Sequence, residues 1–130
     1  MLDGQDGRTL TLCRTARRDS EAVWAYEATL AFAEASATTI VYEHGNWLGP
    51  YLRELAEAWN GFNGVKEYGS LEGQLHLACT HDGRGTVECR VTLRQPWRPE
   101  WRVEAVLEFG AGAHLERLAS DVEAFVESSA

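Results

Sequence analysis

The feature that most constrains the fold is a two-residue hydrophobic period in three consecutive segments, Leu71 to Thr80, Thr86 to Arg94 and Trp101 to Phe109. Apolar side chains there fall mainly on odd-numbered positions, as in "LHLAC" from Leu75 to Cys79. Because successive side chains of a strand point to opposite faces of a sheet, this period predicts three strands that each bury one face. Short connections between them favour antiparallel pairing.

The rest of the chain adds three strands and two helices. The same alternation predicts strands at Thr9 to Cys13, in "VWAYEATLAFAE" from Val23, and at Thr38 to Glu43. Apolar residues recur every three or four positions in "GPYLRELAEAWNG" from Gly49 and "AHLERLASDVEAFV" from Ala113, which predicts two amphipathic helices. The order βββαβββα predicts an α+β fold, in which both helices pack on one face of a curved antiparallel sheet.

The opposite face of that sheet carries polar side chains of mixed sign, which predicts a solvated face and favours a monomer. Its residues are Glu72, Gln74, His76, Glu88, Arg90, Thr92, Arg94, Arg102, Glu104 and Glu108. The length of 130 residues fits one domain, residues 1–130, with 1–7 and 127–130 expected to be disordered. Charges interrupt every apolar stretch before the roughly 18 residues that a membrane helix needs.

The cysteines and the start of the chain bear on the compartment. Three cysteines are an odd number, and "MLDGQDGRTL" lacks the basic start and apolar run of a secretory signal. These features predict a reduced, cytoplasmic protein.

The stretch "CTHDGRGTVEC" from Cys79 to Cys89 could hold a metal, cradle a phosphate or form a turn. Both cysteines are odd-numbered and so share a face, which requires a loop of odd length. The loop Gly83-Arg84-Gly85 sets Cys79 directly opposite Cys89. A zinc site needs four ligands and no second Cys/His pair exists, while a phosphate loop would lead into a helix. We therefore predict a hairpin with two reduced core cysteines; a redox-sensitive pair is the alternative.

The charge balance limits the partners. Twenty acidic and twelve basic residues give a net charge of −8, which disfavours nucleic acid and anionic membranes. An acidic surface can steer a basic protein, although solubility alone also explains the charge. The carboxylates of the helices lie on polar faces, and no serine has a histidine at a telling spacing. The sequence thus predicts no catalytic, cofactor-binding or metal-binding residue, and no enzyme.

Three short stretches are candidates for binding a partner. Exposed Trp and Arg often anchor interfaces, and "QPWRPE" places Trp97 in a loop between two prolines; its alternative role is to fold back and cap the sheet. Three other tryptophans, Trp24, Trp59 and Trp101, lie on apolar stripes and are expected in the core. The candidate partner-binding residues are Trp97, Arg98 and Glu100 in that loop, Glu54 and Glu57 on the first helix, and Glu67 and Tyr68 in the loop after it.

The segments "YLRELAEAWNGFNGV", "SLEGQLHLACTHDGRGTVECRVTL" and "LERLASDVEAF" together resemble a family of small single-domain proteins of unknown function from actinomycete-type bacteria. The resemblance covers roughly residues 47 to 127 and brings no catalytic residues with it. More loosely, the order of strands and helices is similar to that of WapI-type immunity proteins, which neutralise toxins of contact-dependent or polymorphic systems.

Two classes of function follow. The first is a non-catalytic binding module, an immunity-like antitoxin whose acidic surface neutralises a basic toxin. The alternative is a small-ligand-binding protein or minor enzyme with a cleft between sheet and helices.

Overall fold

The computed structural model describes residues 2–4, 7–14, 24–43 and 47–129. These residues form eight strands and two helices in the order ββββαββββα. The first half contains β1 (Leu2–Asp3), β2 (Thr9–Arg14), β3 (Trp24–Phe32), β4 (Ala35–Glu43) and α1 (Leu48–Glu57). The second half contains β5 (Lys66–Gly69), β6 (Leu75–His81), β7 (Thr86–Gln95), β8 (Trp101–Gly110) and α2 (Ala113–Ser129).

The strands form two antiparallel sheets of four strands each, with the orders β1-β2-β3-β4 and β5-β6-β7-β8. The predicted α+β class and antiparallel pairing are confirmed, and the order of elements agrees apart from the short strands β1 and β5. The sequence did not predict the division of the strands between two sheets. A two-residue period shows which face of a strand is buried, but it does not show which strand lies beside it. Leu2, expected in a disordered start, pairs with Leu10, and α2 continues to Ser129.

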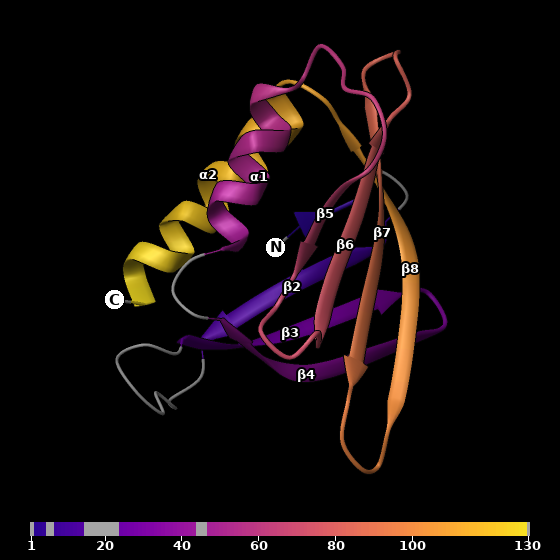
Figure 1. The fold of residues 1–130 in the computed structure, drawn as a ribbon, viewed down its shortest axis with the longest axis vertical. Helices are drawn as coiled ribbons and strands as arrows, with labels where there is room; N and C mark the ends of the chain where they lie inside the picture. Colours follow the sequence, from indigo (N-terminus) through magenta and orange to yellow (C-terminus); the bar gives the residue numbers. More distant parts are fainter. Residues whose placement is uncertain (1, 5–6, 15–23, 44–46, 130) are drawn as a thin grey trace.

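Both sheets and both helices enclose one hydrophobic core. In Figure 1 the strands of the first sheet cross those of the second, and α1 and α2 lie side by side on one side of the upper part of the second sheet. Neither helix has the length and hydropathy that a membrane span needs in the part of the chain described. Both sheets and both helices contribute fully buried leucines to the core. They include Leu10 and Leu30 from the first sheet, Leu75, Leu93 and Leu107 from the second sheet, Leu48, Leu52 and Leu55 from α1, and Leu115 and Leu118 from α2.

The second sheet keeps one face open, as the period predicted. The odd-numbered residues of β6 and β7 are buried except at the strand ends His81 and Gln95, while most even-numbered ones are accessible. Two residues assigned to the open face differ, since Gln74 is fully buried and Thr92 is only 6 % exposed. The expectation of a core position is wrong for Trp59, which is 59 % exposed, because α1 ends before it at Glu57. Trp101 packs partly buried against the core, and the side chain of Trp24 lies outside what the structure describes.

The hairpin between β6 and β7 has the register predicted from the odd numbers of its two cysteines. Cys79 lies directly opposite Cys89, and the backbone N–H of Asp82 donates to the carbonyl of Thr86 at 3.0 Å. Gly83 and Gly85 have φ values of 77° and 92°, the left-handed region that favours glycine. The stretch is therefore a turn, and no cluster of metal-ligating side chains occurs at it or elsewhere among the described residues.

The expected reduced state of the two core cysteines is wrong. Cys79 and Cys89 form a disulfide with an S–S distance of 2.02 Å. Their directly opposed positions bring the two Cα atoms to 4.1 Å, so the register that places them in the core also places them within bonding reach. Both side chains are buried, whereas Cys13 is exposed and free.

Reducing this disulfide should lower the free energy of unfolding by roughly 2–3 kcal/mol, because the bond closes a loop with a sequence separation of 10 and restricts the unfolded chain. Urea unfolding followed by tryptophan fluorescence, with and without a phosphine reductant, measures the difference. The variant Cys13→Ser is the control and should show the same loss. Equal stability of the oxidised and reduced forms would contradict this account.

Candidate functional site

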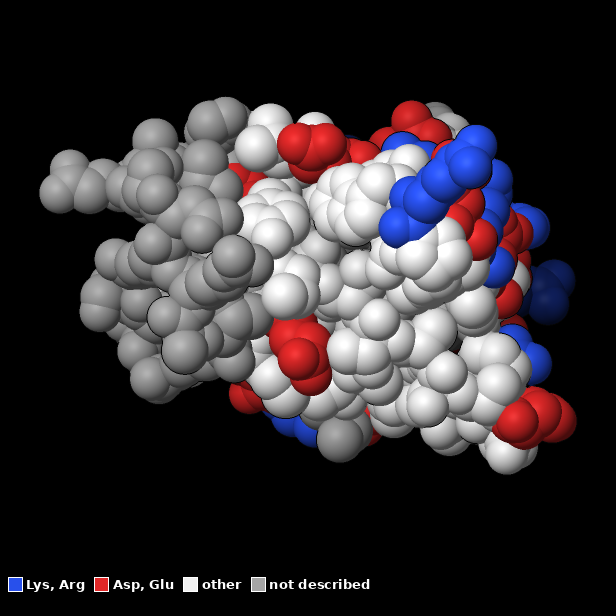
Figure 2. All heavy atoms as spheres, turned by 90° about the horizontal axis from the view of Figure 1, so that it is seen from below, with Lys and Arg blue, Asp and Glu red and all other residues white. Residues whose placement is uncertain are grey.

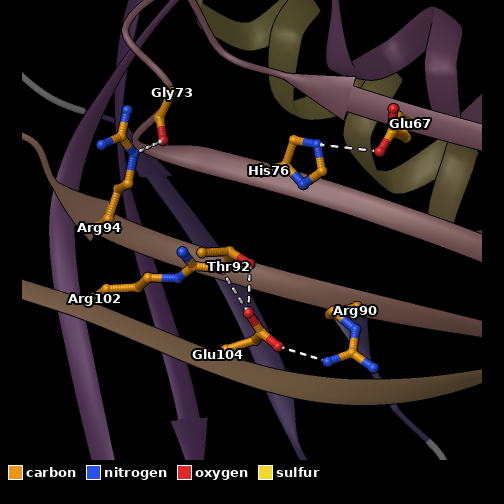
Figure 3. Close-up of polar contacts among 8 residues, drawn as sticks. All are labelled: Glu67, Gly73, His76, Arg90, Thr92, Arg94, Arg102 and Glu104. Atoms are coloured by element: carbon orange, nitrogen blue, oxygen red, sulfur yellow. Dashed lines mark hydrogen bonds and ion pairs between the residues drawn. The ribbon is translucent and has the colours of Figure 1, made fainter.

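A hollow of about 230 Å³ lies on the open face of the second sheet, next to the β5–β6 turn (Figure 3). Its lining comes from four segments: Gly73 in the turn, His76 on β6, Thr92 and Arg94 on β7, and Arg102 on β8. His76 lies opposite Thr92, and Arg94 lies opposite Arg102. The even-numbered positions of three paired strands thus project into one place, on the face away from the core.

Two arginines of the lining, Arg94 on β7 and Arg102 on β8, occupy directly opposite strand positions. Like charges directly opposite on neighbouring strands destabilise a sheet, so the pair Arg94 and Arg102 costs stability unless a negative group lies nearby. Arg94 is held in place by the turn: its Nε donates to the carbonyl of Gly73 at 2.9 Å, and its Nη2 donates to that of Glu72 at 3.3 Å. These two carbonyls orient the guanidinium without neutralising its charge.

Gly73 is the residue that lets Arg94 approach the turn. It has a φ of 73°, and an added Cβ would come within 2.7 Å of Arg94 Nη2. Any other residue would combine backbone strain with a collision against the guanidinium. The turn sequence and the arginine position therefore depend on each other.

Glu104 on β8 supplies the nearest carboxylate. Its Oε1 accepts from Arg90 at 2.7 Å, and its Oε2 accepts from Arg102 at 3.0 Å and from the Thr92 hydroxyl at 3.3 Å (Figure 3). The hydrogen bonds from Arg90 and then Arg102 lower the pKa of Glu104 below its usual value, so it is ionised at neutral pH. Glu104 thus pairs with Arg90 and Arg102, whereas Arg94 donates to the backbone carbonyls of the turn.

The predicted loop residues lie at the adjoining end of the sheet. The pair Gln95 and Trp101 is the last of the β7–β8 ladder, directly after the arginine pair, and the loop between them carries Trp97 with Arg98 and Glu100. All three are exposed, Trp97 to 46 %, so Trp97 does not cap the sheet. Figure 2 views this end of the molecule and shows a broad area of uncharged residues, bordered by Asp or Glu and, on one side, also by Lys or Arg.

The other predicted partner-binding carboxylates are separate from this place. Glu54 on α1 pairs with Lys66 at 2.9 Å, and Glu57 is exposed on the same helix. Between the helices, Arg53 bonds both Glu116 and Glu123 of α2. Arg53 thus engages two helix carboxylates that would otherwise add to an acidic surface.

Glu67 on β5 lies beside β6, with its Oε1 3.8 Å from His76 Nε2 (Figure 3). It is the one predicted partner-binding carboxylate found next to the hollow.

Tyr68 does not form a binding surface, contrary to expectation. It is only 5 % exposed, and its hydroxyl donates to Oε2 of the fully buried Glu43 at 2.6 Å. The hydroxyls of Tyr68 and Tyr26 lie 3.1 Å apart. Glu43 Oε1 accepts the backbone N–H groups of Trp47 and Leu48 at the start of α1, at 2.8 and 3.2 Å. Tyr68 was misassigned because β5 has only four residues, too few to show a period.

Replacing Glu43 by Gln should lower the free energy of unfolding by about 2–4 kcal/mol, since an amide cannot accept all three charge-assisted hydrogen bonds and buries a donor without a partner. Chemical denaturation measures this. Glu57→Gln on the exposed face of α1 is the matched control and should stay within about 0.5 kcal/mol of the parent protein. Equal effects of the two substitutions would show that the Glu43 network does not stabilise the fold.

The same network should resist alkali until the fold opens. Burial raises the pKa of Tyr68 and of Tyr26, and the neighbouring Glu43 carboxylate raises that of Tyr68 further. Because an unfolded tyrosine ionises near pH 10, the stability from this burial is complete below about pH 10 and is lost as pH rises above it. Absorbance of tyrosinate and circular dichroism should change together above that pH. Ionisation of every tyrosine near pH 10 with the fold intact would contradict the prediction.

One larger hollow lies along the first sheet, and another lies between that sheet and strands β7 and β8 of the second. The two share three lining residues, Arg8, Phe32 and Glu34. No helix residue lines either of them or the arginine hollow, in the part of the chain that is described. The cleft between sheet and helices that the ligand-binding alternative requires is not among these three.

Sequence reasoning placed the arginines of the hollow on a solvated face and missed their convergence. The signal that could have found them is the pairing of β7 with β8. The two prolines of "QPWRPE" indicate a short loop between these strands. A short loop there places Arg94 opposite Arg102.

Comparison with known families identifies a family of unknown function. A model of a family of unknown function, DUF6228, matches residues 1–129. This confirms the coarse resemblance to a family of unknown function and extends it beyond residues 47–127. No curated protein and no solved structure matches the chain.

Proposed function

Since the chain belongs to the DUF6228 family, whose function is unknown, we propose that it is a non-catalytic binding module that engages a protein partner at the β7–β8 end of the second sheet. The observation that carries this proposal is Trp97, a large aromatic side chain that is 46 % exposed in a short loop. Trp and Arg dominate binding energy at interfaces, and Arg98 stands beside Trp97.

Leu71 supports the same location. It is 39 % exposed in the β5–β6 turn, two positions before Gly73 of the hollow. Its backbone N–H donates to the carbonyl of Tyr42 on β4 at 2.8 Å, which holds the turn against the first sheet. Two apolar side chains on fixed turns around an arginine-lined hollow combine apolar anchors with a charged group, as interface centres do.

An immunity-like antitoxin is the narrower form of this proposal. In that form, the negative net charge would speed association with a basic toxin, and the exposed carboxylates of α1 would face the toxin. The immunity-like antitoxin therefore predicts that capture of the toxin weakens steeply as the salt concentration rises. A partner that instead buries the apolar side chain of Trp97 should still be captured at high salt.

The test is capture of partners from lysate of the source organism by the tagged protein, at low and high salt, with identification by mass spectrometry. Trp97→Ala should weaken the captured complex by about tenfold or more. Trp59→Ala is the matched control, because Trp59 is also exposed, to 59 %, and follows the end of α1 at Glu57. That end of α1 and the β7–β8 loop lie at opposite ends of the molecule (Figure 1). A partner lost equally with both variants would overturn the assigned surface, and a basic toxin among the captured proteins would support the immunity-like form.

A further inference from the structure

We propose that the hollow formed by Gly73, His76, Thr92, Arg94 and Arg102 is a binding site for an oxyanion, and that its occupant is a carboxylate of the protein partner. The identity of the occupant as a partner's side chain rests on the proposed function. The oxyanion site itself does not.

Local charge is the first argument. The chain carries a net charge of −8, yet this part of the second sheet carries three arginines, Arg90, Arg94 and Arg102. Two carboxylates lie near them: Glu104, which pairs with Arg90 and Arg102, and Glu67, which lies 3.8 Å from His76. Glu104 is shared between Arg90 and Arg102 and makes no hydrogen bond or ion pair with Arg94. A further negative group between Arg94 and Arg102 would offset the repulsion between two arginines at directly opposite strand positions.

The donors that remain are the second argument. A guanidinium has five N–H groups, of which Arg94 uses one at Nε and one at Nη2 for the carbonyls of the turn. Arg102 gives one hydrogen bond to Glu104 among the described residues. Both arginines therefore keep N–H groups in the planar arrangement that matches carboxylate and phosphate oxygens. The His76 ring, on the third strand of the hollow, adds a possible donor.

Size decides what kind of anion fits. Pockets for cofactors and drug-sized ligands span about 300–1,000 Å³, and this hollow measures about 230 Å³. It suits a single carboxylate or phosphate group, presented at the end of a side chain or free in solution. The apolar residues Trp97 and Leu71 on the neighbouring turns favour a group that belongs to a protein.

The guanidinium of Arg94 is oriented before any anion binds. Arg94 is held by two backbone carbonyls of a turn whose Gly73 leaves no room for a Cβ. An arginine oriented in this way loses less conformational entropy when it binds an anion than a freely moving one. Gly73 is accordingly a positioning residue for the site.

The test is a titration of the isotope-labelled protein with glutarate and, separately, with inorganic phosphate, at constant ionic strength set by sodium chloride. Amide and arginine Nε–Hε signals of the hollow should shift with a common saturation curve. Arg102→Gln should weaken binding about tenfold or more, and Arg94→Lys, which keeps the charge but loses the planar donors, should also weaken it. Arg84→Gln, in the hairpin loop at the other end of the sheet, is the control and should bind as the parent does.

The variant Gly73→Ala distinguishes binding to a preorganised site from nonspecific attraction to positive charge. It leaves every charge in place but displaces Arg94, so it should weaken glutarate binding, with circular dichroism confirming that the variant folds. Unchanged binding by Gly73→Ala and Arg94→Lys, or shifts at Arg84 with the same midpoint, would overturn the oxyanion site. Tighter binding of phosphate than of glutarate would overturn the carboxylate assignment.

The two proposals fail in different ways. If glutarate saturates the hollow but Trp97→Ala leaves partner capture unchanged, the site stands and the proposed interface is wrong. If Trp97→Ala abolishes capture and no oxyanion saturates the hollow, the interface stands and this inference is wrong.

Discussion

The buried carboxylate of Glu43 is the interaction on which the rest of the structure depends. It ends β4 in the first sheet, accepts the first backbone N–H groups of α1, and receives the hydroxyl of Tyr68 from the second sheet. A fully buried charge is tolerated only when it is well hydrogen-bonded, so each of these donors offsets part of a large desolvation cost. The helix start, also favoured by its dipole, and the docking of the two sheets are therefore tied to one side chain.

The hollow on the open face follows from the same arrangement. Tyr42, the residue before Glu43, accepts the N–H of Leu71 and so fixes the β5–β6 turn against the first sheet. That turn contains Gly73, whose carbonyl orients Arg94 on the opposite side of the second sheet from the core. The position of a surface arginine is thus set by contacts that begin at the buried junction of two sheets. This gives the arginine more order than an exposed side chain on a strand would have by itself.

The fold could be predicted from the sequence where one local period decides the structure. Alternation identified the faces of the long strands, and parity alone placed Cys79 opposite Cys89. Prediction failed where the outcome depends on residues far apart in the chain: the division into two sheets, the short strand β5, and the burial of Tyr68 against Glu43. The disulfide lies between these cases. The register brought the cysteines together, but an odd cysteine count and the start of the chain argued for a reduced state.

Net charge averages over the whole surface and does not show where charges of one sign gather. A value of −8 predicts a basic partner, whereas the hollow on the second sheet is lined by Arg94 and Arg102, and the site that we propose there would take an acidic group. Arg53 engages two of the helix carboxylates that seemed free in the sequence, and Lys66 engages a third. The sign of an interface is set by charges that remain unpaired after the strands and helices are placed. For this chain, register rather than composition determines which charges those are, and the register of β7 with β8 leaves two arginines facing each other.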